Sequence, residues 1–234
     1  MSVVTGVLQG STQYRIGSFV GYAMGRAING NSVSLDITNG SNFPVDVHEG
    51  DLIITAIARG GTGDNASSMS TSGYSKILSE FSNDTNDTNL DVFVKISDGT
   101  ETTIASASTG QTADSVIFCA MVFRGVQQIK YLLAREQVNT DDPRINDVSD
   151  LNYGNICVVI GAAAHVLGEG LGDQFEQGGD LEDFQTLSES DTYDITFGMG
   201  YRRITNETGY APSAMIGDLS GASSGTCSAI LVLD

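Results

Sequence analysis

The chain has 234 residues, and 40% of them are hydrophobic, which is enough to bury the core of one large domain. Its formal net charge is −18, from 29 acidic and 11 basic residues. A surface this negative repels phosphate backbones and anionic lipids. We therefore exclude nucleic acids and membrane surfaces as expected partners.

Glycine and small polar residues indicate the fold class. The chain has 28 Gly, only 3 Pro and no Trp. Short clusters of Gly, Ser, Thr, Asn and Asp separate segments that are rich in β-branched residues. This distribution is typical of sheets joined by many turns. We predict an all-β fold, an antiparallel β-sandwich.

The first 30 residues are predicted to form an N-terminal arm and a first strand. Glycines at positions 17, 21 and 25 would each cost a helix about 1 kcal/mol, which favours a bent or edge strand. Residues 1–10 have neither basic side chains nor a long apolar run, so we predict no signal peptide. No window is apolar for long enough to span a membrane.

The stretch Glu49–Ala58 organises the first half of the chain. A Gly-Asp pair, which favours a turn, leads directly into apolar and β-branched residues, and this predicts a central buried strand. The loop that follows, Arg59–Ser68, is rich in Gly and is expected at the surface. A meander of five strands is predicted over Gly50–Ala58, Tyr74–Phe81, Leu90–Ile96, Thr102–Ser106 and Ser115–Phe123.

The second half of the chain repeats this pattern. A Gly-Asn pair in Tyr153–Ala162 leads into another apolar run, and the later matches are Phe184–Ser190, Tyr193–Ile204, Ala214–Asp218 and Cys227–Leu233. The sequence predicts a degenerate duplication or two similar sheets that face each other across one core.

We divide the predicted domain, one fused sandwich, into four parts. They are an arm and first strand at 1–30, a first half at 31–125, a polar crossover at 126–152 and a second half at 153–234. Within the crossover, Ile129–Arg135 is compatible with helical turns or with a strand.

No cluster of residues indicates catalysis. Gly221–Gly225 fits the G-x-S-x-G pattern of hydrolases, but a strand follows it and no histidine comes later, so we interpret it as a turn. His48 and His165 lack the spacing of a metal site and are interpreted as surface or core residues. We predict no enzymatic activity, no catalytic residue and no cofactor.

Metal binding has two kinds of candidate residue. Cys119, Cys157 and Cys227 lie in apolar runs without CxxC spacing, which favours buried thiols over a disulfide or a zinc site. The acidic runs Asp84–Asp91 and Asp173–Asp183 contain the oxygen ligands that calcium prefers, but neither has the spacing of an EF-hand loop. We interpret both runs as solvated loops and predict no metal site.

The tyrosines offer a glycan-stacking surface as an alternative to packing within the fold. They are scattered near strand starts and no Trp accompanies them, so we favour packing in the core or at its rim. The residues concerned are Tyr74, Tyr153, Tyr193, Tyr201 and Tyr210.

Several short motifs resemble those of small virion proteins of tailed bacteriophages. They are Phe19–Gly21, Gly50–Ile54 with its Gly-rich loop, Val92–Thr102 and Val122–Val126. The resemblance covers most of residues 17–126 and, more loosely, 154–233. It implies a jelly-roll-like sandwich that decorates a capsid or forms part of a tail or fibre, and it carries over no catalytic residue.

The sequence and the resemblance together favour a non-enzymatic virion structural protein that is made in a host cytoplasm. We expect a capsid decoration or cement protein that binds the major capsid protein, other virion proteins and further copies of itself, through loops and its N-terminal arm. The alternative is a receptor- or glycan-binding module of a tail or head fibre, with loops Arg59–Ser72 and Gly168–Asp183 in contact. A small hydrolase would need a histidine near Ser223.

Overall fold

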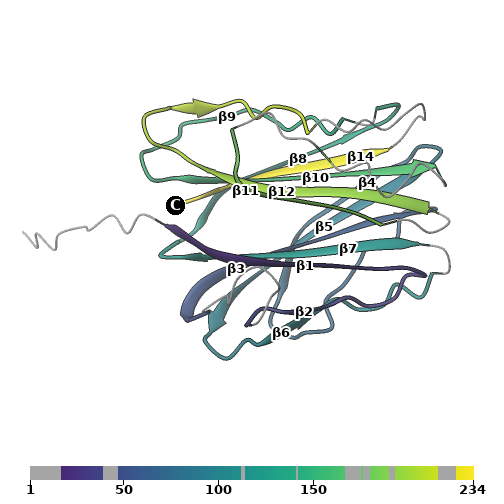
Figure 1. Ribbon diagram of the computed structural model, residues 1–234. Coiled ribbons are helices and arrows are strands. Elements are labelled where there is room, and N and C mark those ends of the chain that lie inside the picture. The colour runs from purple at the N-terminus through teal and green to yellow at the C-terminus, as the bar shows by residue number, and fades with distance from the viewer. Residues whose placement is uncertain are drawn as a thin grey trace, which may run out of the picture.

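Two five-stranded antiparallel sheets pack face to face in a β-sandwich (Figure 1). The fold class predicted from the sequence is confirmed. The computed structural model describes residues 17–38, 47–111, 114–140, 142–166, 175, 180–189, 193–215 and 225–234. Within these residues, no helix is long and apolar enough to cross a membrane.

The first half of the chain forms the first sheet. Its strands lie in the order β1 (Ser18–Ala27), β7 (Ser115–Arg124), β3 (Glu49–Gly61), β5 (Asp87–Asp98) and β4 (Ser75–Ser82). A short ribbon lies on the outer face of this sheet and consists of β2 (Ser34–Asp36) and β6 (Thr103–Ala105) (Figure 1).

The second half of the chain forms the second sheet. Its strands lie in the order β8 (Ile129–Gln137), β14 (Thr226–Leu233), β10 (Ile156–Val166), β12 (Tyr193–Arg203) and β11 (Glu182–Glu189). Its outer face carries a ribbon of β9 (Val148–Ser149) and β13 (Gly209–Tyr210).

Both halves have the same topology. In each half the first strand pairs with the last, the second with the second-last, and the third with the third-last. The third strand also pairs with the last, and the fourth lies at the sheet edge beside the fifth. Such nested antiparallel pairing is that of a jelly roll. Each half is therefore a jelly-roll-like unit, as the duplication hypothesis predicts.

The strand order differs from the predicted meander, which was wrong. Strand β5 lies between β3 and β4, and β6 has left the sheet for the ribbon. The region 126–152, assigned to a crossover, contains β8 and β9, the counterparts of β1 and β2. The sequence placed the counterpart of β6 at Ala214–Asp218, but in the structure the counterpart is β13. The sequence did not predict strand β8 clearly. An edge strand buries only part of one face, and this weakens the alternation of apolar residues.

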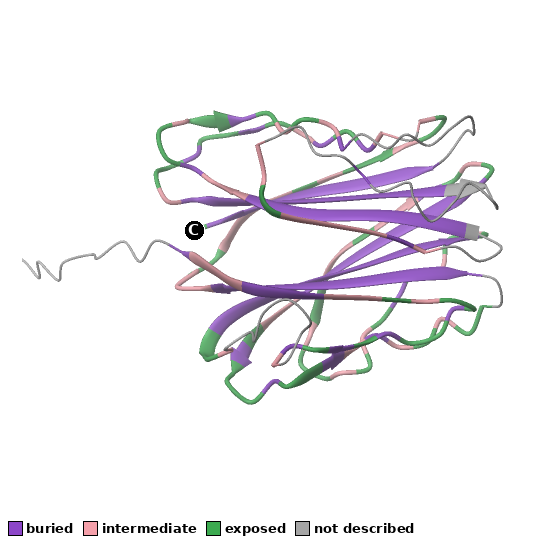
Figure 2. Cartoon of the chain, in the orientation of Figure 1, coloured by how far each residue is buried: buried purple, intermediate pink, exposed green. Residues whose placement is uncertain are grey.

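Apolar side chains form three layers. The largest core lies between the two sheets and includes Ile54 from the first sheet and Phe197 from the second. Smaller cores lie under the two ribbons, around Ile37 and Phe118 in one half and around Tyr210 in the other. The central strands are buried on both faces (Figure 2), which explains why their sequences are continuous apolar runs.

The two halves are related by an approximate two-fold rotation. Strand β3 lies across the core from β10 and β12, and β10 lies across from β3 and β5. Likewise β7 faces β12 and β11, whereas β14 faces β5 and β4. Each of these contacts across the core is thus matched by its counterpart, as in a symmetric dimer whose two subunits have been joined, whereas β4 lies closer to β8 than β11 does to β1.

The same turn starts the third strand of each half. In the first half, Asp51 N–H donates to His48 O over 3.1 Å, and His48 N–H donates to Asp51 Oδ2 over 2.8 Å. In the second, Asn155 N–H donates to Asn152 O over 3.1 Å, and Asn152 N–H donates to Asn155 Oδ1 over 2.8 Å. The intervening glycines have φ of 88° and 89°, a left-handed conformation that disfavours other residues.

Each turn is also bound to the end of the last strand. Asp51 accepts hydrogen bonds from Arg124 Nε at 2.9 Å and Nη2 at 2.8 Å. At the matching position, Asn155 Nδ2 donates to Leu233 O at 3.3 Å and to Asp234 Oδ1 at 3.0 Å. The acid of one half and the amide of the other therefore connect the same two strand ends.

We expect Asp51→Ala to lower the free energy of unfolding by about 2 kcal/mol, because it removes a hydrogen bond of the turn and an ion pair whose carboxylate is buried and whose guanidinium is partly exposed. Chemical denaturation measures this change. The matched control is Glu49→Ala, an exposed neighbour, which should change stability by less than about 0.5 kcal/mol. Equal effects of the two substitutions would contradict the role of the turn.

Candidate functional site

Two seams run along the sides of the sandwich, where an edge strand of one sheet lies beside an edge strand of the other. Strands β1 and β11 form one seam, and β4 and β8 form the second. The two-fold relation exchanges these seams. Any difference between them therefore shows where the molecule departs from its own symmetry.

The β1–β11 seam is closed by an ion pair and by aromatic rings. Arg26 Nη1 donates to Ser188 O at 2.6 Å, and Arg26 Nε lies 3.2 Å from Glu189 Oε2. Towards the other end of the seam, the rings of Phe19 and Tyr201 are 4.8 Å apart. We call this side the closed seam.

The β4–β8 seam has smaller residues at the aromatic positions. Ile129 takes the place of Phe19, since both pair with the end of the last strand next to a bulge. Val94 takes the place of Tyr201, since each pairs with the residue four positions after the turn glycine of its half. The two rings of the closed seam are thus replaced by two aliphatic side chains.

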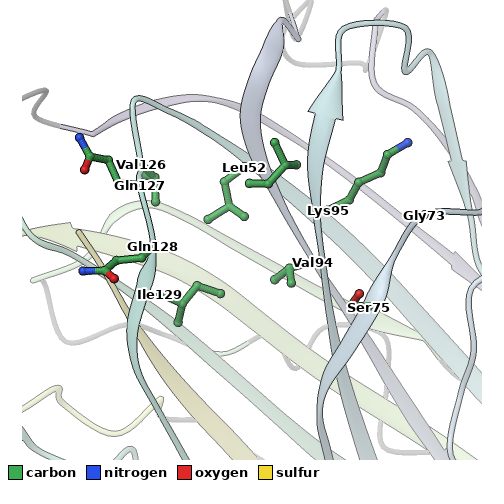
Figure 3. A pocket seen from close by; sticks show the side chains of 10 residues that line it. Leu52, Gly73, Ser75, Val94, Lys95, Val126, Gln127, Gln128 and Ile129 are labelled. Atoms are coloured by element: carbon green, nitrogen blue, oxygen red, sulfur yellow. The ribbon is translucent and has the colours of Figure 1, made fainter.

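A pocket of about 330 Å³ lies where the rings are missing. Its apolar wall consists of Leu52, Val94, Val126 and Ile129, which converge on one space in Figure 3. The side chains of Gln127 and Gln128 point away from that space. The pocket is therefore an apolar hollow at one end of the β4–β8 seam.

At the opposite end of this seam a hydrogen bond from Ser82 Oγ to Gln137 O replaces the ion pair. Glu136 occupies the position of Arg26, and Ser82 occupies that of Glu189. Partial burial and the negative charge of Glu136 raise the pKa of Glu80. A second pocket of about 410 Å³ lies here, lined by Phe81, Asn83, Glu136, Gln137 and Val138.

Exposed apolar side chains lie along the same seam. Leu133 is 40% exposed, Val138 is 53% exposed and Ile96 is 59% exposed. Strands β4 and β8 are both sheet edges, with one side of each backbone unpaired by a strand of the described fold. Asn146 covers part of β8 by donating to Ala134 O at 2.9 Å. We call this surface, with its two pockets, the open seam.

The acidic run at Asp84–Asp91 has a structural role that the sequence did not indicate. Asp87, Asn89 and Asp91 project from β5 and accept hydrogen bonds from alternate backbone amides of the Gly-rich loop, at positions 63, 65 and 67. Asp91 also pairs with Lys76 at 2.7 Å. All three β5 side chains are buried, so the solvated loop predicted here was wrong for them.

The start of the Gly-rich loop was also predicted wrongly. Arg59 is 1% exposed and belongs to β3, which continues to residue 61. Its Nε lies 3.2 Å from Asp114 Oδ2. Burial lowers the pKa of the Arg59 guanidinium, and the nearby carboxylates, Asp114 foremost, act against that shift. Asp114 thus supplies the opposite charge that a buried arginine needs within the strand.

The remaining candidate residues for catalysis or metal binding are far apart in the fold or lie outside the described residues. The three cysteines are buried and unpaired, and burial raises the pKa of Cys157 to about 12. His48 is exposed at the turn before β3. Gly221–Ser224 and the His165 side chain lie outside the described residues, as does most of Gly168–Asp183. In the part that is described, no group of His, Cys, Asp and Glu side chains is placed to hold a metal ion.

The tyrosines do not form one surface. Tyr201 packs in the core between the sheets and Tyr210 packs under the β9–β13 ribbon, on opposite faces of the second sheet. Their hydroxyls donate to Asp183 Oδ2 at 3.1 Å and to Asp180 Oδ2 at 2.9 Å. Tyr153, by contrast, is 69% exposed. Core packing is thus confirmed for the two buried rings.

No family model, no curated protein and no solved structure matches this chain. The candidate site is therefore identified by the differences between the two seams of this one molecule.

We expect Glu80→Gln to stabilise the protein by about 0.5 kcal/mol at pH 7, a small gain because solvent screens this partly exposed pair of acids. A raised pKa in the folded state means that wild-type stability falls as pH rises through the range where Glu80 ionises. The gain should therefore disappear below the ordinary pKa range of glutamate. Denaturation at a series of pH values measures it, with exposed Glu49→Gln as the control. A gain in stability that does not change with pH would contradict the raised pKa of Glu80.

Proposed function

We propose that this protein is a non-enzymatic virion structural protein, a capsid decoration or cement protein that binds neighbouring subunits through the open seam. The observation that carries the proposal is the difference between the two seams. The β1–β11 seam is bridged by an ion pair and by aromatic rings, whereas the β4–β8 seam carries two pockets and exposed apolar residues.

Those features fit contact with another protein. An edge strand offers backbone donors and acceptors to a second chain. Exposed apolar side chains beside it lose contact with water on binding, which favours association. On the open seam these features coincide over β4 and β8, so one partner surface would cover all of them.

The charge of the open seam indicates the chemistry of the partner. Glu80 and Glu136 lie close together in a chain whose net charge is −18. In the closed seam the position of Glu136 is held by Arg26, which forms an ion pair. A partner that presents a basic side chain here would supply the missing positive charge.

The engagement of several buried carboxylates within the fold supports a non-enzymatic role. Asp51 binds Arg124, Asp91 binds Lys76, and Asp87 accepts a backbone N–H from the Gly-rich loop. These groups hold turns and loops in place. The same hydrogen bonds attach the loop Arg59–Ser72 to β5, which makes it a part of the sheet surface and less suited to fold around a glycan.

Val138 provides a direct test, because symmetry supplies its control. Val138 and Ile28 each follow an edge strand at matching positions, and they are 53% and 42% exposed. We expect Val138→Asp to weaken binding to capsids that lack the protein by at least about tenfold, since it places a charge in an apolar contact. Ile28→Asp, on the closed seam, should bind as the wild type does.

Co-sedimentation with capsids measures the binding, and light scattering of the protein alone gives its oligomeric state. A monomer or loose oligomer that sediments with capsids, and loses this property with Val138→Asp alone, supports the proposal. A stable trimer that ignores capsids but binds host cells would overturn it in favour of the fibre module.

A further inference from the structure

Charged side chains of opposite sign lie on the two faces of the edge strand β8. Arg135 pairs with Ser228 and lies on the outer face of the sheet, where Ile230 of the same neighbouring strand packs under the ribbon. Glu136 pairs with Cys227, which belongs to the core between the sheets, and therefore lies on the inner face. The edge of β8 thus has a basic side and an acidic side.

Two arginines without an acidic partner make up the basic side. Ser228 Oγ lies 2.8 Å from Arg144 O and 3.5 Å from Arg135 O, so the two arginines are neighbours. Both residues are exposed, and no ion pair or hydrogen bond joins either guanidinium to another described residue. In a chain with a net charge of −18, they form a small positive surface that the fold does not neutralise.

Glu136 and Glu80 make up the acidic side. Burial raises the pKa of Glu80, and the negative charge of Glu136 raises it further, as expected for neighbouring carboxylates that share no cation. Among the residues that the structure describes, neither carboxylate has an ion-pair or hydrogen-bond partner. The acidic side is therefore complementary in charge to the basic side, which lies across the same strand.

A pocket of about 410 Å³ opens on the acidic side. Its lining includes the Glu136 carboxylate, the Phe81 ring and the exposed side chain of Val138. A planar guanidinium forms an ion pair with a carboxylate, stacks on an aromatic ring and packs its methylene groups against apolar side chains. The lining of this pocket therefore suits an arginine side chain.

The backbone of β8 is partly occupied near the pocket. Ala134 O accepts a hydrogen bond from Asn146 Nδ2 at 2.9 Å, and Gln137 O accepts one from Ser82 Oγ. Each bond takes an acceptor that an added strand would use. At this end of the open seam, a partner is therefore expected to dock through side chains.

We propose that the open seam binds a second copy of this chain in a two-fold dimer, in which Arg135 of each copy enters the pocket beside Glu136 of the other. A two-fold axis parallel to β8 places the basic side of one edge opposite the acidic side of the other, so each contact is made twice. Leu133 and Val138, which are 40% and 53% exposed, lose contact with water in such a dimer.

This inference goes beyond the proposed function, because it concerns two copies of the chain without a capsid. The contact depends on exposed charges, so the dimer is weak and dissociates further as salt is added. A weak dimer releases the open seam wherever a capsid subunit binds more tightly to it.

Exchange of the charges tests the dimer, with sedimentation equilibrium at low salt as the measurement. We expect Arg135→Glu and Glu136→Arg each to raise the dissociation constant at least about tenfold, because each places like charges opposite one another. The variant that carries both substitutions has opposite charges again and should return to within about threefold of the wild type. Glu49→Arg, at an exposed turn, is the control for net charge and should change the constant less than about twofold.

The proposal is overturned if the wild type stays monomeric at millimolar concentration, if the single exchanges have no effect, or if the double exchange does not recover association. Recovery by the double exchange also excludes misfolding as the cause of the single effects. Capsid binding by Val138→Asp is a separate measurement. A monomeric wild type that binds capsids and loses this binding with Val138→Asp would overturn the dimer and leave the proposed function standing.

Discussion

The apolar core between the two sheets is the constraint on which the rest of the structure depends. Each sheet presents apolar side chains on both faces, such as Ile54 towards the shared core and Ile53 towards the ribbon. Neither half can expose its inner face to water without losing the largest of the three cores. The two jelly-roll-like units therefore form one cooperative structure, and each turn at the start of a third strand secures the strand ends that border this core.

The two halves of the molecule are nearly symmetric, and the two seams differ most clearly in their side chains. Matching positions have the same turn, the same bulges and the same pairing in both halves. The two seams differ at matching positions. The closed seam has aromatic rings and an ion pair, and the open seam has aliphatic and acidic residues. Hydrogen bonds from Ser82 Oγ to Gln137 O and from Asn139 N–H to Asp84 Oδ2 also join the β4–β8 seam, but this seam keeps two pockets. The two pockets and the exposed apolar residues of the open seam are the basis on which we propose that it is a contact surface.

The sequence indicated the repeated unit but not the site. Gly50-Asp51 and Gly154-Asn155 could be recognised because positive φ and a short polar side chain favour few residue types. The continuous apolar runs likewise revealed β3, β7, β10 and β14. Strand order and residue equivalence were not predictable, since they depend on pairing between distant segments. The hydrogen bonds that Asp87 and Asp91 accept from a loop have no sequence signature. The open seam depends on the structural equivalence of Val94 and Tyr201, which the sequence does not reveal.

The central claim is that partners bind at the open seam and not at the closed one. Site-specific photocrosslinking in the assembled particle tests it most directly, with a photoreactive side chain placed at position 138 or at the symmetry-related position 28. Our account predicts protein adducts from position 138 and none from position 28. Adducts from position 28, or equal yields from both positions, would contradict it.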